Sequence, residues 1–196
     1  MKIGIAGIGG IGSNVARLLA QAKVDHIKMV DFDGVEISNL NRQFYTISQA
    51  GEKKTLSLKA NLLQIYPGMT IETVTKRMGP GDAIKIFSDC AIVVEGFDDK
   101  VLKKMIIEEL STRETILVSA SGIAGTDMDR VGVKKMGNCH IVGDLASDQE
   151  DHVLFPPKIA MVSSLMAAIV LTHINGQGLQ KADSKGELPD NKGENR

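Results

Sequence analysis

The feature that most constrains this chain is a glycine-rich loop, Gly7-Ile8-Gly9-Gly10-Ile11-Gly12, which directly follows the apolar run Ile3 to Ala6. An apolar run of this length is typical of a β-strand, and the helical pattern from Ser13 to Ala22 completes the opening of a βαβ unit. The early glycines permit a tight turn and close approach of a phosphate, and the last lets the helix pack against the strand. The loop therefore predicts a nucleotide bound at a helix N-terminus.

The alternation of short apolar runs and helical patterns continues along the chain. We expect further strands at 27–30, 71–75, 90–95 and 116–119, and helices at 54–66, 82–87 and 100–110. Asp82 is expected to cap the helix that follows it. Beyond Ser121, the pair Gly137-Asn138 separates two short strand patterns and indicates an antiparallel hairpin. The sequence predicts an α/β fold: a Rossmann-like, doubly wound, mainly parallel sheet with helices on both faces and an antiparallel hairpin toward the C-terminal edge.

The length and composition suit a single domain. A chain of 196 residues with 43% hydrophobic composition can bury one core, and we place the domain at 1–175. The last apolar stretch, 159–171, follows Pro156-Pro157 and falls short of the roughly 20 residues that a bilayer span requires, so we expect a buried helix and no membrane partner. Residues 176–196 are polar and are expected to form a disordered tail.

Charge and cysteine content bound the partners and the compartment. The net charge of −1 does not favour binding to a nucleic acid, so any anion site must be local. The two cysteines, Cys90 and Cys139, are too few for a four-thiolate zinc site. The N-terminus lacks the cleavage pattern of a signal peptide. We expect a reducing, cytoplasmic setting.

A polar cluster behind the glycine loop narrows the choice of nucleotide. Asp31 lies at the end of the second expected strand, about twenty residues past the loop, where a carboxylate meets ribose hydroxyls. A dinucleotide enzyme needs one such acid, but this chain adds a set of side chains suited to a triphosphate: Asn39, Arg42, Gln43 and Lys54. The set favours adenylate chemistry over hydride transfer.

The glycine loop, Asp31-Phe32-Asp33-Gly34-Val35 and Ser38-Asn39-Leu40-Asn41-Arg42-Gln43 together resemble the ThiF/MoeB/HesA family, the bacterial relatives of ubiquitin-activating enzymes. The match runs in order from residue 3 to about 171, and the Ser-Asn-Leu-x-Arg-Gln hexapeptide is its most specific part. The short chain and Ile141-Val142-Gly143-Asp144 most resemble the compact ThiF type, which activates the sulfur carrier of the thiazole pathway.

The resemblance implies an adenylyltransferase. It would use ATP and Mg²⁺ to adenylate the C-terminal glycine carboxylate of a ubiquitin-like sulfur carrier ending in Gly-Gly, with release of pyrophosphate, in thiamine thiazole biosynthesis. It also implies a homodimer. No general base is required, because a C-terminal carboxyl with a pKa of about 3.5 is already ionised at neutral pH.

The resemblance also assigns roles to residues. Arg42, Lys54 and Asp98 would be catalytic, the two cations neutralising charge at the phosphates and Asp98 holding Mg²⁺. The family's usual Asp-Asn pair reads Asp98-Asp99 here, so Asp99 is expected to be a helix cap or a second metal contact. The nucleotide would be held by Gly7, Gly9, Gly10, Gly12, Asp31, Asp33, Asn39, Arg42, Gln43 and Lys54.

Several departures keep alternatives open. Many family members carry an arginine before the first strand, and larger relatives carry zinc-binding cysteines and a reactive cysteine. We expect Cys139 to be structural and Cys90 to lie in the core. A binding scaffold that lost catalysis is one alternative. A nicotinamide-dependent oxidoreductase using the glycine loop and Asp31 is another, although it leaves Arg42 and Lys54 unexplained.

Overall fold

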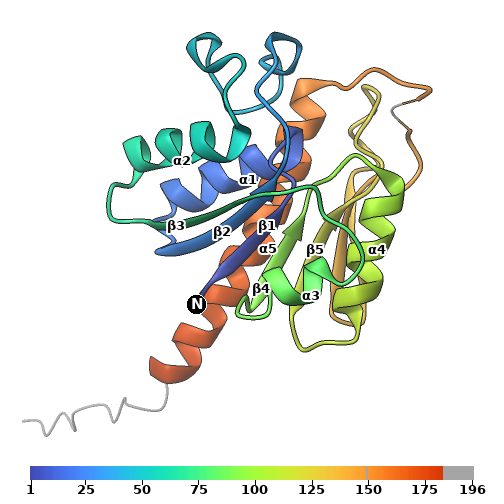
Figure 1. Cartoon of the computed structure of the whole chain (residues 1–196). Helices are drawn as coiled ribbons and strands as arrows, with labels where there is room; N and C mark the ends of the chain where they lie inside the picture. Colours follow the sequence, from blue (N-terminus) through green and yellow to red (C-terminus); the bar gives the residue numbers. More distant parts are fainter. Residues whose placement is uncertain (149, 183–196) are drawn as a thin grey trace, which may run out of the picture.

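The computed structural model describes residues 1–148 and 150–182, and of 177–182 the backbone alone. Its centre is a seven-stranded sheet in the order β3-β2-β1-β4-β5-β7-β6 (Figure 1). Neighbouring strands are parallel except β6 and β7, which form an antiparallel hairpin at the edge. The strands are β1 (Ile3–Ala6), β2 (His26–Asp31), β3 (Thr70–Thr75), β4 (Ile92–Glu95), β5 (Ile116–Ala120), β6 (Gly132–Met136) and β7 (Cys139–Gly143). The predicted fold class is confirmed.

Helices cover both faces of the sheet and define two apolar clusters. One face packs against α1 (Gly10–Gln21), α2 (Lys54–Ile65) and α5 (Pro156–Ala182), and the other against α3 (Asp82–Ile86) and α4 (Lys100–Ser111) (Figure 1). Two short 3₁₀ turns, η1 (Ile37–Asn39) and η2 (Ile47–Gln49), lie in the connection between β2 and α2. The central strands β1 and β4 are buried on both sides, as a doubly wound sheet requires.

The helices form where the apolar spacing predicts them. In α1, Ile11, Val15 and Leu19 recur every fourth residue and all are buried, so one stripe of the helix faces the sheet and α5. In α4, Ile106 and Leu110 supply the buried face, and Leu102 packs against the same cluster. The apolar periodicity therefore fixes which side of each helix meets the sheet.

The cap of α3 differs from the expectation. The N-cap position is Gly81, and Asp82 is the first helical residue. Gly81 has φ of +80°, a left-handed conformation that glycine adopts without strain. The Asp82 carboxylate still serves the helix start, because it accepts a hydrogen bond from the Gly79 N–H at 2.9 Å.

The last helix, α5, runs past the predicted domain boundary at residue 176 and ends at Ala182. A single glycine such as Gly176 costs about 1 kcal/mol in a helix interior, too little to stop a helix that is already propagating. The remainder of the predicted tail, 183–196, lies outside the described residues.

The segment Pro156–Gly176 of α5 is long and apolar enough to cross a membrane. Helices in the core of a folded protein can meet the same two criteria. One stripe of α5, including Ile159, Val162 and Met166, is buried against α1 and the sheet. The opposite stripe, including Ala160, Ser164 and Ala168, is exposed. The expectation of a buried helix therefore holds for one face of α5 only.

Candidate active site

The glycine loop joins β1 to α1 at the carboxyl end of the sheet. Gly7 has φ of +80°, and its N–H donates to the Val30 carbonyl at 2.9 Å. A Cβ on Gly12 would lie 1.9 Å from the Gly7 carbonyl oxygen, so only glycine permits this contact between helix and loop. No side chain caps the N-terminus of α1 and no acidic residue occupies its first turn. The free N–H groups there suit an anion.

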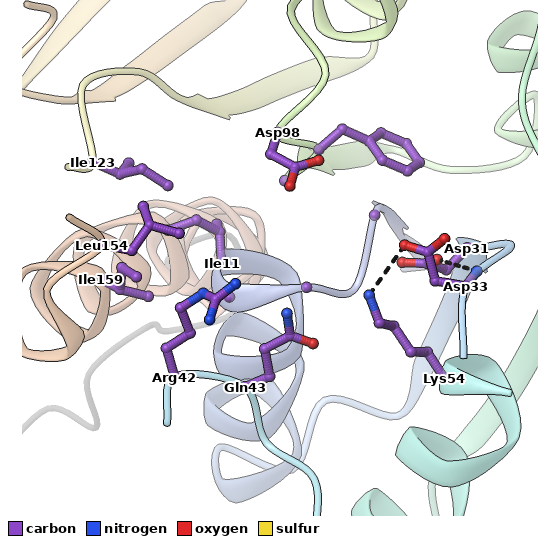
Figure 2. Close-up of a pocket in the computed structure, with 15 residues that line it drawn as sticks. Ile11, Asp31, Asp33, Arg42, Gln43, Lys54, Asp98, Ile123, Leu154 and Ile159 are labelled. Carbon is purple, nitrogen blue, oxygen red and sulfur yellow. Dashed lines mark hydrogen bonds and ion pairs between the residues drawn. The ribbon is translucent and has the colours of Figure 1, made fainter. Parts of the chain in front are cut away.

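A cleft opens at this helix N-terminus and gathers most of the predicted residues (Figure 2). Asp98 lies on one side of it, with Arg42 and Gln43 on the other, and Ile123 and Leu154 close one end. The predicted residues that line the cleft are Gly7, Gly9, Gly10, Asp31, Asp33, Arg42, Gln43, Lys54 and Asp98. Residues separated by up to 91 positions in the chain (7 to 98) are thus brought together.

Two positively charged side chains, Arg42 and Lys54, line the cleft; both come from the part of the chain that follows β2. The Arg42 guanidinium donates from Nη1 to the Ser38 carbonyl at 3.1 Å and to Asn41 Oδ1 at 2.9 Å. Lys54, the first residue of α2, is 6% exposed, and its Nζ lies 3.2 Å from Asp33 Oδ2. Asp33, which is half-exposed, is the only ion-pair partner of Lys54 among the described residues, and both side chains line the cleft, so the Lys54 ammonium is placed to contact an incoming anion.

Gln43 supplies an independent sign of a ligand. Its Oε1 is buried and has no hydrogen-bond partner among the described residues. Buried polar atoms are nearly always satisfied, and one left open at a cleft suits a donor group of a bound molecule. The backbone carbonyl of the neighbouring Arg42 is held by Asn14 Nδ2 at 2.8 Å, so α1 fixes the segment that carries both side chains.

The predicted ribose acid, Asp31, is 3% exposed and already engaged with the backbone. Its Oδ2 accepts from the Ile8 N–H and its Oδ1 from the Asp33 N–H, both at 2.9 Å. Asp31 therefore holds the glycine loop against the end of β2. Each carboxylate oxygen can accept more than one hydrogen bond, so a role toward ribose hydroxyls stays a prediction.

Three predicted residues do not line this cleft. Gly12 lies behind the loop, where it permits the close packing described above, and Asn39 lies in η1. Asp99 is the N-cap of α4, where its carboxylate accepts from the N–H groups of Val101 and Leu102 at 2.8 and 2.9 Å. Of its two expected roles, the structure shows the helix cap.

Asp98 is the acid best placed for a cation at the cleft. It is exposed, and it forms no hydrogen bond or ion pair with any part of the chain that the structure describes. Within that part, no group of three or more histidine, cysteine or acidic side chains is arranged to hold a metal. Mg²⁺ is commonly bound through one or two carboxylates together with substrate phosphates, and Asp98 beside an anion cleft fits that pattern.

Sequence reasoning missed a second cavity that adjoins the cleft. It has a volume of about 360 Å³ and shares Asp33, Phe97 and Asp98 with the cleft. Its other walls include Phe32, Met78 and Met105, and the Arg77 guanidinium lies 4.2 Å from the centre of the Phe32 ring. An apolar cavity with one stacked cation suits a planar base. The aromatic residue inside Asp31-Phe32-Asp33 was the available signal.

The remaining candidates are structural. Burial raises the pKa of the Cys90 thiol to about 12, and burial together with Glu95 raises the pKa of Cys139 above its usual value. A raised pKa disfavours the reactive thiolate at both positions. The His140 ring packs edge-to-face on the His173 ring, with 5.3 Å between the two ring centres. Burial, with smaller contributions from the neighbouring His173 and Lys135, lowers the pKa of His140 below its usual value.

The chain resembles two characterised proteins over much of its length. It is 32% identical over 186 residues to the adenylyltransferase and sulfurtransferase UBA4 of Candida glabrata, covering 89% of this chain and 42% of that one. It is 30% identical over 142 residues to the tRNA threonylcarbamoyladenosine dehydratase of Bacillus subtilis, covering 70% of this chain and 56% of that one. The chain thus spans about half the length of these relatives.

A solved structure has the same fold. The E. coli tRNA N6-threonylcarbamoyladenosine dehydratase TcdA in complex with AMP matches with a TM-score of 0.82 and 19% identity, covering 91% of this chain and 87% of that one. The same protein has also been solved with ATP. At this identity the likeness establishes the fold.

The family profile covers nearly the whole chain. The description "ThiF family" applies to residues 1–193, a range that includes the glycine loop, the Asn39-to-Gln43 segment and Asp98. The resemblance predicted from those motifs is confirmed. The chain belongs to the ThiF family.

Proposed function

We propose that this protein is an ATP-dependent adenylyltransferase that activates the C-terminal carboxylate of a small ubiquitin-like sulfur carrier, in thiamine thiazole formation. The observation that carries the proposal is the cleft itself. An uncapped helix N-terminus, Arg42, Lys54 and the open Gln43 oxygen line one cleft, opposite Asp98, which has no ion-pair partner among the described residues. Such a set binds a polyphosphate and a divalent cation.

The chain's own residues supply what the reaction needs. A carboxylate must approach the α-phosphorus of ATP; its oxygen forms a bond there while the bond to the oxygen leading to the β-phosphate breaks, and pyrophosphate leaves. Negative charge repels negative charge in this approach, so Arg42 and Lys54 act by neutralising the phosphate oxygens. Mg²⁺ held at Asp98 would add positive charge to the same oxygens.

The adenine base of ATP and the C-terminal tail of the carrier protein would occupy separate cavities. The apolar cavity beside Phe32 and Met78 suits the adenine base. A third cavity of about 240 Å³ also contains Asp98 in its lining, and small residues at the end of β5 and just after it, Ala120, Ser121 and Gly122, form part of its wall. Its small lining residues suit an extended glycine tail. A cytoplasmic homodimer belongs to the same proposal.

A second substrate class follows from the relatives that are named as tRNA dehydratases. The threonyl group of threonylcarbamoyladenosine also carries a carboxylate, so the same cleft could act on a modified tRNA. The net charge of −1 favours the protein carrier over the polyanion. The two candidates share the nucleotide site and differ in what reaches it.

ATP–pyrophosphate exchange tests the proposal. Purified protein with Mg²⁺ is given a panel of Gly-Gly carriers, including the thiazole-pathway carrier, and in parallel tRNA bearing threonylcarbamoyladenosine. We expect exchange with one carrier only, reduced about a hundredfold in Arg42→Ala. Arg113→Ala, which removes an exposed arginine just beyond the C-terminal end of α4, is the matched control and should exchange normally.

Exchange with tRNA alone would mean that the substrate is a modified tRNA and not a carrier protein. Carrier binding without any exchange would identify a scaffold that has lost catalysis. NADH binding tighter than ATP binding would overturn the adenylyltransferase assignment altogether.

A further inference from the structure

Asp98 has no ion-pair partner among the described residues, although two lysines follow it closely, at positions 100 and 103 at the start of α4. Both lysines are engaged elsewhere. Lys100 Nζ lies 2.6 Å from Asp148 Oδ2 and 3.1 Å from Glu150 Oε1. Lys103 forms an ion pair with Glu95. Asp98 is therefore available to a cation because other acidic side chains already form ion pairs with the two lysines.

Glu95 is the more informative of these acids because it is fully buried. It ends β4 and has no exposed surface. Its carboxylate accepts from Ser119 Oγ at 2.6 Å and from the Phe97 N–H at 2.8 Å, in addition to the contact with Lys103. A buried carboxylate with an ion-pair partner and two further donors is well satisfied, and breaking such a set is costly.

The contacts of Glu95 also control the turn that carries Asp98. The Phe97 N–H belongs to that turn, and the Gly96 N–H donates to the Ala6 carbonyl at 2.8 Å. A Cβ on Gly96 would lie 3.0 Å from the Gly12 N, so the turn packs directly on the glycine loop. Glu95 thus holds the turn through the Phe97 N–H, and the glycine loop packs against the same turn.

Lys103 has a clear alternative partner. Its side chain is 21% exposed and lines the same 240 Å³ cavity as Asp98. Without the charge on Glu95, the Lys103 ammonium would be partly buried with no counter-ion. Two acids line its cavity, and because Asp148 is already paired with Lys100, Asp98 is the acid left to receive Lys103. An ion pair between them would neutralise the carboxylate that a divalent cation needs.

We propose that Glu95 is a positioning residue that holds Lys103 away from Asp98 and fixes the Asp98 turn, so that Asp98 stays available to a divalent cation bound with the nucleotide. The inference rests on the proposed function only in taking Mg²⁺ and ATP as the ligands of the cleft. Glu95 itself touches neither ligand in this assignment.

The test measures ATP binding by calorimetry over a range of Mg²⁺ concentrations, with urea unfolding of each variant. Glu95→Gln should raise the Mg²⁺ concentration for half-maximal effect about tenfold, because outer residues of a metal site typically contribute this much. ATP binding in EDTA should not change. The double variant Glu95→Gln with Lys103→Met removes both charges, and the Mg²⁺ dependence should return to the wild-type value.

The double variant separates positioning from a purely structural role. Were Glu95 needed only for folding, removal of Lys103 would not restore the Mg²⁺ response. The inference is overturned by a folded Glu95→Gln protein with wild-type Mg²⁺ dependence, or by a folded double variant that is still weakened tenfold. Should Glu95→Gln alone fail to fold, the double variant carries the test by the same criterion.

The experiment also separates this inference from the proposed function. Wild-type protein that binds ATP with no response to Mg²⁺ overturns the cation site at Asp98 and this inference with it. Wild-type protein that binds Mg²⁺ and ATP but performs no pyrophosphate exchange removes the proposed reaction, and the comparison of Glu95 variants still decides the positioning role.

Discussion

At the residue scale, the two glycines at the ends of the loop have different physical reasons for being glycine. Gly7 needs φ of +80°, and Gly12 has no room for a Cβ beside the Gly7 carbonyl. Gly10 has neither constraint, because a Cβ there would meet only ordinary contacts, the nearest at 3.6 Å from a methyl of Ile159. The three positions look alike in the sequence and are distinguished by their surroundings.

This difference predicts the outcome of two alanine substitutions. Gly12→Ala should lower the free energy of unfolding by about 3 kcal/mol or more, because the loop cannot retreat while the Gly7 N–H is bonded to β2. Gly10→Ala, in the first turn of the same helix, should change it by less than about 1 kcal/mol. Urea denaturation measures both, and equal losses would contradict the packing argument.

At the element scale, the connection from β7 to α5 is anchored by a buried ion pair. Lys158, in the first turn of α5, has no exposed surface, and its Nζ lies 2.6 Å from both Asp144 Oδ2 and the Ala124 carbonyl. Burial alone would raise the pKa of Asp144, but hydrogen bonds from Lys158 and from the N–H groups of Ser147 and Ala146 outweigh it and hold the pKa well below its usual value. The pair fixes both ends of the connection that bears Leu154.

Removing one partner of this pair should be strongly destabilising. We expect Lys158→Met to lower the free energy of unfolding by about 3–5 kcal/mol at pH 7, because it leaves Asp144 charged and unpaired. Adding Asp144→Asn should recover part of the loss. Because the pKa of Asp144 is lowered, its contribution is complete above the usual value of 3.8 and is lost as the pH falls below it.

The control for this measurement is Lys104→Met on α4. Lys104 and Glu108 form an exposed pair at 3.7 Å, and its removal should leave the stability unchanged within error. A loss in the control as large as in Lys158→Met would show that burial is not the cause.

At the scale of the whole molecule, α5 joins the core on one side and leaves a stripe of small, mostly apolar side chains exposed on the other. Exposed apolar patches on a folded domain commonly mark an interface. Ala160, Ser164 and Ala168 are small, so a second helix could approach this stripe closely. The same helix is also long and apolar enough for a membrane span. An experiment can distinguish a stripe that contacts a second protein chain from one that contacts lipid.

We expect the protein to be a homodimer that uses this stripe. Light scattering during gel filtration should give twice the chain mass for the wild type and a single chain mass for Ala168→Arg, which introduces charge into the stripe. Ala60→Arg places the same change on an exposed position of α2 and should stay dimeric. A monomeric wild type, or flotation with lipid vesicles, would contradict the dimer.

Local patterns in the chain are sufficient to predict the order of the elements and most of the residues that line the cleft at the glycine loop. Apolar periodicity and the Gly137-Asn138 turn predict most strands and helices to within a few residues, because these signals act between near neighbours. The exception is α5, which runs from Pro156 to Ala182 although the apolar stretch covers 159–171 only. The motifs at 7–12 and 31–43 predict the cleft residues because the carboxyl ends of β1 and β2 must meet at one edge of a parallel sheet.

Packing alone decides the contacts between positions far apart in the chain. That Lys103 pairs with Glu95 and not with Asp98 depends on where α4 lies over β4 and β5. That Ile123 and Leu154 close the cleft depends on the path of two connections after β5 and β7. An isolated sequence labels each of these residues as an ordinary charge or an ordinary apolar side chain. Their roles arise because burial removes water as a partner, so the nearest protein group becomes decisive.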